Sequence, residues 1–226
     1  MKDGLHNALV AFVDFIYAVV FTILVQQTFD RVINEASLSW SEKALRLLIV
    51  VAVFYFLAWD WIVGRILTLR HPYESYSRFF FEVLIAAFAY GTANAAVEGK
   101  VSLLVCFAFL LLAGMFWAMR TERQVERTDQ WEVHSKRDAQ ELCMIQSLHF
   151  SGAVVALIFY CWWESQVNSK ATWTFGVIIV FALWCFVFAY ELMVPRQKGI
   201  IAGPGVPFVG RSNLRKLRRL IFELID

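Results

Sequence analysis

A carboxylate and a hydroxyl lie inside an apolar stretch near the start of the chain. Asp14 and Thr22 are two helical turns apart in the otherwise apolar and aromatic run 12–25, and Gln26 and Gln27 follow directly after it. A charge within an apolar run is costly in a membrane, and such residues usually pair with another charge or line an ion pathway. The run is therefore the first candidate for ion-conducting or ion-pairing chemistry.

One face of this run could line a pore. Phe15, Val19, Thr22 and Gln26 follow each other at helical spacing, and Asp14 lies on an adjacent row. Several copies around an axis would form an apolar constriction at Val19, with hydroxyls beyond it and amides at the outer mouth. Apolar constrictions flanked by polar rings gate ion flow. The alternative, which we weight equally, is a packing helix with one paired acid.

Further acids lie in or at the edge of other apolar runs, and three of them, Asp60, Glu82 and Glu191, map to the same side of the membrane as Asp14. Interhelical ion pairs near the interface would explain them. An acidic vestibule that concentrates cations at an inner pore mouth would explain them as well. The sequence leaves both interpretations open.

Enzyme motifs are absent from the sequence. It contains no HExxH, Gly-x-Ser-x-Gly, phosphate-binding or dinucleotide-binding pattern, and its four histidines and four cysteines have no metal-ligand spacing. We therefore expect no enzyme activity, no metal and no cofactor. The basic end of the chain lacks the interleaved aromatic residues of nucleic-acid-binding segments, so we expect no nucleic-acid partner.

Composition predicts an all-α, polytopic membrane protein. The chain has 226 residues, of which 59% are hydrophobic, and its mean hydropathy is +0.57. A membrane-spanning helix needs about 20 apolar residues, and six runs come close to this length. We place the six helices of a transmembrane domain 1–195 at about 7–27, 45–66, 79–97, 101–119, 148–164 and 172–194.

The basic residues predict that both termini lie in the cytoplasm. In that orientation the cytoplasmic side holds all of the 21 lysines and arginines except Arg31, Lys43, Arg46, Lys100 and Lys170. We expect a charged cytoplasmic loop at 120–147 and a cytoplasmic tail at 196–226. Residues 212–225 of the tail have the pattern of a basic amphipathic helix, which would bind anionic lipid or pack on a neighbouring protein.

The first helix also resembles a known family. Phe12-Val13-Asp14 and the residues up to Val25 are similar to the helix-one hallmark of the lysosomal potassium channel family of the transmembrane-protein-175 type, particularly its prokaryotic members. Phe12, Asp14, Ala18, Thr22, Leu24 and Val25 match in register, and Val19 falls at the position of the family's aliphatic gate. Ala8 stands where the hallmark has an arginine, which leaves His6, Arg65 and Arg78 as candidate partners for Asp14.

This resemblance implies a homo-oligomeric channel, with a tetramer favoured, that conducts potassium or other monovalent cations through a pore lined by helix one. Phe12 and Asp14 would anchor that helix in each subunit. It also implies a multi-pass protein of a prokaryotic inner (plasma) membrane. The alternative is a membrane-embedded scaffold or sensor subunit, in which the 120–147 loop and the tail recruit a cytoplasmic partner and helix one only packs.

Overall fold

The computed structural model describes residues 2–73, 76–127, 133–165 and 172–193, and this part of the chain consists of helices and the short turns between them. A short π-helical turn, Phe29–Ile33, extends α1. The prediction of an all-α fold is confirmed for the described residues. The six α-helices are α1 Lys2–Thr28, α2 Trp40–Arg70, α3 Tyr76–Glu98, α4 Ser102–Arg127, α5 Val133–Ser165 and α6 Thr172–Met193.

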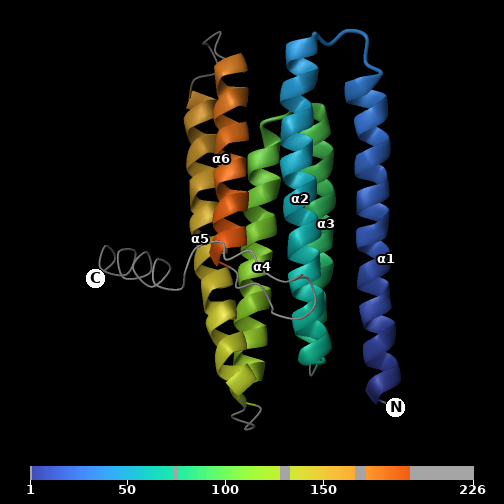
Figure 1. Ribbon diagram of the computed structural model, residues 1–226, viewed down its shortest axis with the longest axis vertical. Helices are drawn as coiled ribbons and strands as arrows, with labels where there is room; N and C mark the ends of the chain where they lie inside the picture. Colours follow the sequence, from blue (N-terminus) through green and yellow to red (C-terminus); the bar gives the residue numbers. More distant parts are fainter. Residues whose placement is uncertain (1, 74–75, 128–132, 166–171, 194–226) are drawn as a thin grey trace, which may run out of the picture.

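The helices form one elongated bundle with α1 at its edge (Figure 1). α4 packs against α3 and α5, whereas α1 packs mainly against α3 and α2. α6 lies at the opposite side of the bundle from α1 and contacts α2 and α5. One face of α1 is therefore left uncovered by the other helices of its own subunit.

Five helical segments are long and apolar enough to cross a membrane. They are Gly4–Ile33, Trp40–Arg70, Tyr76–Glu98, Ser102–Val125 and Leu142–Glu164, and α6 adds a shorter apolar segment, Gly176–Tyr190. These lengths and compositions are those of an integral, multi-pass membrane protein. The sixth crossing and the orientation of the termini stay predictions.

The start of α2 shows how local sequence sets a helix boundary. The Ser39 side chain accepts a hydrogen bond from the Glu42 backbone N–H, and the Glu42 carboxylate accepts one from the Ser39 backbone N–H. This reciprocal pair satisfies two donors that the first helical turn would leave without partners. The sequence Ser39-Trp40-Ser41-Glu42 predicts this capping box, and the structure confirms it.

The segment 120–147, expected as a charged cytoplasmic loop, is helical in its described residues, and its side of the membrane stays a prediction. α4 continues to Arg127, as the alternating charges after Arg120 indicate, but α5 already begins at Val133 rather than near 148. The two extensions pack together because the charged segment still carries an apolar face, on which Val125, Leu142 and Ile145 are buried. The tail 196–226, with its predicted helix 212–225 and lipid contact, lies outside the described residues.

Candidate functional site

The row of α1 residues that the sequence assigns to a pore lies on the surface of the subunit. Phe15, Val19, Thr22 and Gln26 are all exposed, whereas Val13, Tyr17, Val20 and Leu24 form the buried face of the same helix. The Thr22 hydroxyl donates to the carbonyl oxygen of Ala18 at 2.8 Å, which satisfies its proton within the helix. The polar row thus lies on the side of α1 that faces away from the subunit.

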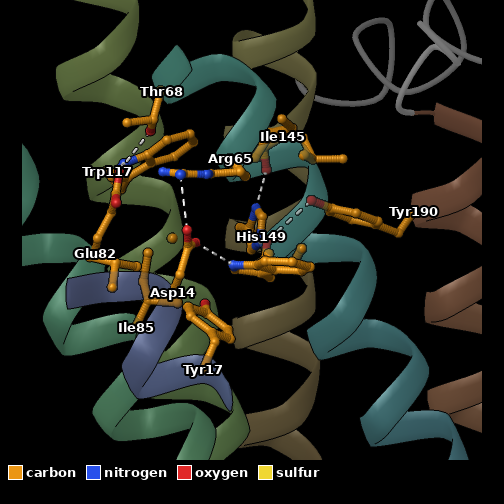
Figure 2. Close-up of a pocket in the computed structure, with 16 residues that line it drawn as sticks. Asp14, Tyr17, Arg65, Thr68, Glu82, Ile85, Trp117, Ile145, His149 and Tyr190 are labelled. Atoms are coloured by element: carbon orange, nitrogen blue, oxygen red, sulfur yellow. Dashed lines mark hydrogen bonds and ion pairs between the residues drawn. The ribbon is translucent and has the colours of Figure 1, made fainter. Parts of the chain in front are cut away.

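Asp14 points the other way, into the bundle (Figure 2). Its carboxylate forms an ion pair with Arg65 Nη2 of α2 at 2.9 Å and accepts a hydrogen bond from Trp61 Nε1 at 3.1 Å. Of the three candidate partners, Arg65 is therefore the one that pairs with Asp14. Phe12 is half exposed, and its ring centre lies 6.1 Å from that of Phe79 in α3.

Asp14 is one of three carboxylates around an internal cavity of about 40 Å³. A buried water needs roughly 10–15 Å³ of such volume, so the cavity has room for about three or four. Every one of the six helices contributes to its wall. The lining residues are Val13, Asp14 and Tyr17 of α1; Asp60, Trp61, Val63, Gly64, Arg65 and Thr68 of α2; Glu82 and Ile85 of α3; Gly114 and Trp117 of α4; Ile145 and His149 of α5; and Tyr190 of α6.

Glu82 is held by neutral donors. Its carboxylate accepts hydrogen bonds from Thr68 Oγ1 at 2.9 Å, from Trp117 Nε1 at 2.8 Å and from the Tyr73 hydroxyl. Tyr73 lies in the turn between α2 and α3. Burial raises the pKa of its phenol far above the usual range, and the charge of Glu82 and the hydrogen bond to Glu82 raise this pKa further. Tyr73 therefore stays a protonated donor across the physiological pH range.

Arg78 contacts all three residues that donate hydrogen bonds to Glu82. It is 1% exposed and donates to the Thr68 hydroxyl at 2.9 Å, to Gln124 Oε1 at 3.2 Å and to the His71 carbonyl. Its guanidinium carbon also lies 5.4 Å from the ring centres of both Tyr73 and Trp117. These contacts join α2, α3 and α4 at the same end of the bundle.

Asp60 has a different environment from the other two acids. The Tyr190 hydroxyl donates to Asp60 Oδ1 at 3.2 Å, and His149 Nε2 lies 3.7 Å from the same oxygen. Asp14, Asp60 and Glu82 thus line one cavity, although each has its own set of partners. The side chain of Glu191, the fourth acid assigned to this region, lies outside the described residues.

Sequence reasoning missed most of the groups that hold these acids. Trp61 and Trp117 each direct the indole N–H to a carboxylate of the cavity, and nothing in the sequence marks them as its partners. Thr68 gives no signal either, because a threonine hydroxyl in a helix can bond to a carbonyl of that helix. The reach of the Tyr190 hydroxyl to another helix depends on how the helices pack. Trp61 and Arg65 are four residues apart and therefore lie on the same face of α2. This spacing is the one local pattern that could have suggested that both residues contact the same acid.

Comparison of the chain with protein-family models, with curated proteins and with solved structures finds no match. The similarity to the lysosomal potassium channel family is thus carried by the helix-one residues alone. What that similarity implies about conduction and assembly stays a prediction, and the geometry of α1 and of the cavity is the basis for the proposals below.

Proposed function

We propose that several copies of this chain assemble into a cation channel permeable to potassium, with α1 of each copy lining a shared pore. The observation that carries the proposal is the two-sided arrangement of α1. Its inner face is held to α2 by the Asp14–Arg65 ion pair, and its outer face presents Val19, Thr22 and Gln26. An amide and a hydroxyl on the outside of a membrane helix are better placed beside water than beside lipid.

The ion pair sets the rotation of α1 and so decides which residues would face the axis. With Asp14 directed inward, Val19 occupies the middle of the exposed row, one turn from Phe15 on one side and one turn from Thr22 on the other. A ring of Val19 side chains forms a narrow apolar constriction that water crosses reluctantly, which is a recognised form of gate. Closed rotational symmetry brings identical residues together at this level, and we favour a tetramer in a prokaryotic inner membrane.

Potassium efflux from proteoliposomes tests this function. We expect flux with the wild-type protein and a several-fold increase with Val19→Asn, because an amide ring hydrates the apolar constriction and lowers the barrier to a hydrated ion. Val154 is the matched control, since it is a valine of α5 with the same exposed fraction of 39% as Val19. Val154→Asn should leave the flux unchanged.

Two outcomes would contradict the channel. The first is the absence of flux with both the wild-type protein and Val19→Asn in correctly folded, reconstituted samples. The second is an equal change of flux with Val19→Asn and Val154→Asn, which would indicate a general disturbance of the bilayer. The scaffold alternative predicts the first outcome, because α1 then only packs and no copy of Val19 faces a pathway.

A further inference from the structure

Among the described residues, Asp60 is the acid of the cavity with the fewest polar partners, since it accepts one hydrogen bond and forms no ion pair with an arginine or a lysine. Asp14 is paired with Arg65, and Glu82 accepts three hydrogen bonds beside Arg78. In the described part of the chain, Asp60 contacts only the Tyr190 hydroxyl and the ring of His149. One neutral hydrogen bond compensates poorly for moving a carboxylate out of water. A further positive charge is needed at this position.

The ring of His149 is oriented to supply that charge. Its Nδ1 lies 2.8 Å from the carbonyl oxygen of Ile145, one helical turn earlier in α5. A carbonyl oxygen has no proton to give, so Nδ1 must be the donor of this hydrogen bond. In the neutral ring Nε2 then carries the lone pair, and Nε2 is the nitrogen that faces Asp60 Oδ1 at 3.7 Å. Two lone pairs would face each other across this gap unless a proton lies on one of them.

The ring of His149 is closely packed inside the bundle. His149 is 2% exposed, and Gly114 of α4 leaves the space that the ring occupies, since a Cβ at Gly114 would lie 3.1 Å from Nε2. Within the described residues, Nε2 has no hydrogen-bond partner, and it faces Asp60 at the cavity that both residues line. A ring nitrogen with a lone pair beside a carboxylate is a place where a proton can bind.

The cavity also offers a route for that proton. The residues around the cavity differ in how far they are exposed. The side chains of Asp14 and Arg65 are 32% and 26% exposed. The side chains of Asp60 and His149 are 15% and 2% exposed, so they lie deeper in the bundle. The volume between them has room for water, which carries protons between groups that do not touch. A proton can therefore enter beside the Asp14–Arg65 pair and reach Asp60 and His149 at the closed end.

We propose that Asp60 and His149 form a proton-binding site inside each subunit. A hydronium ion in the cavity gives its proton to the Nε2 lone pair, which leaves a water molecule and an imidazolium that faces the Asp60 carboxylate. Tyr190 donates to the same carboxylate, so the occupied site joins α2, α5 and α6. The site is independent of the proposed pore, because it needs neither a second subunit nor ion flow.

The other charged and titratable groups around the cavity favour this occupancy on balance. Asp14 and Tyr17 face the site from α1, Arg65 from α2 and Glu82 from α3. The described lining residues of α4, Gly114 and Trp117, carry no charge. With Asp60 included, three carboxylates stand against two guanidiniums, that of Arg65 in the wall and that of Arg78 beside Glu82. This leaves the region negative, and a negative surrounding stabilises a bound proton.

Nitrogen-15 NMR of the full chain, labelled at histidine and held in detergent micelles, tests the site. The His149 signal is assigned with His149→Gln. In the wild type we expect the signal of imidazolium, with a proton on both ring nitrogens, in place of the neutral Nδ1–H tautomer. At the same pH, Asp60→Asn should lower the imidazolium fraction several-fold, because the carboxylate that stabilises it is gone.

Two variants keep the test decisive. Asp60→Glu retains the carboxylate and should retain the imidazolium, and Asp30→Asn, a change at an exposed acid outside the cavity, should leave the signal as in the wild type. An imidazolium fraction that is the same in the wild type and in Asp60→Asn would overturn the proposal. A His149 signal that follows the potassium chloride concentration and not the pH would overturn it too, since a metal cation would then occupy the gap.

Discussion

Asp14→Asn should destabilise the folded protein by about 2 kcal/mol. The substitution keeps an oxygen that can accept the Trp61 hydrogen bond, so it removes mainly the charge opposite Arg65. Breaking a fully buried ion pair costs about 3–5 kcal/mol, and exposed pairs are worth about 0–1 kcal/mol. The side chains of this pair are 26% and 32% exposed, which places the expected loss between these limits. Unfolding by denaturant in mixed micelles measures it.

A double-mutant cycle separates the pair from its surroundings. Arg65→Gln should also destabilise the protein, and Asp14→Asn combined with Arg65→Gln should cost at least about 1 kcal/mol less than the sum of the two. Trp61→Phe removes the indole donor alone and should cost only about 1 kcal/mol. Additive losses in the cycle would mean that the ion pair does not hold α1 in its rotation.

The second large effect is expected at Arg78, where even the conservative change Arg78→Lys should cost about 3 kcal/mol. The charge is kept, but an ammonium group cannot reproduce the planar fork that lies between two aromatic rings and donates to several acceptors at once. The acceptors would then be left buried with fewer donors. The groups affected are Thr68, His71, Tyr73, Trp117 and Gln124.

Arg123→Lys is the control for this change. Arg123 is exposed on the same end of α4, and an exposed substitution of this kind alters stability by less than about 0.5 kcal/mol. The measurement is the same denaturant unfolding, with fluorescence of the native tryptophans as the signal. Equal, small effects at Arg78 and Arg123 would show that the buried guanidinium contributes no more than its charge.

The sequence was sufficient for the features that depend on local pattern. Apolar run length predicts where helices lie, and the Ser39–Glu42 pair predicts the start of α2. The early start of α5 was not predicted, because Leu142 and Ile145 form too sparse an apolar face within a charged segment to be recognised without the partner helix. Charged residues mark the membrane boundary in a sequence, but a helix can continue beyond that boundary.

The partners of the buried acids could not be predicted for a different reason. A carboxylate inside an apolar run indicates that Asp14 needs a partner, but choosing Arg65 over His6 and Arg78 requires the relative rotation of α1 and α2. The contact of Tyr190 with Asp60 spans 130 residues of sequence. Such contacts are set by how all the helices pack, and no spacing within one helix encodes them.

Cross-linking through a cysteine on the exposed row of α1 tests most directly whether copies of this helix face one another. The experiment uses Thr22→Cys in a chain whose Cys106, Cys143, Cys161 and Cys185 are replaced by alanine, and the membranes are treated with an oxidant. We predict disulfide-linked dimers from Thr22→Cys and none from Val154→Cys, a change on α5, which lies at the other side of the bundle from α1. Monomers alone from Thr22→Cys, or dimers from Val154→Cys only, would contradict a pore lined by α1.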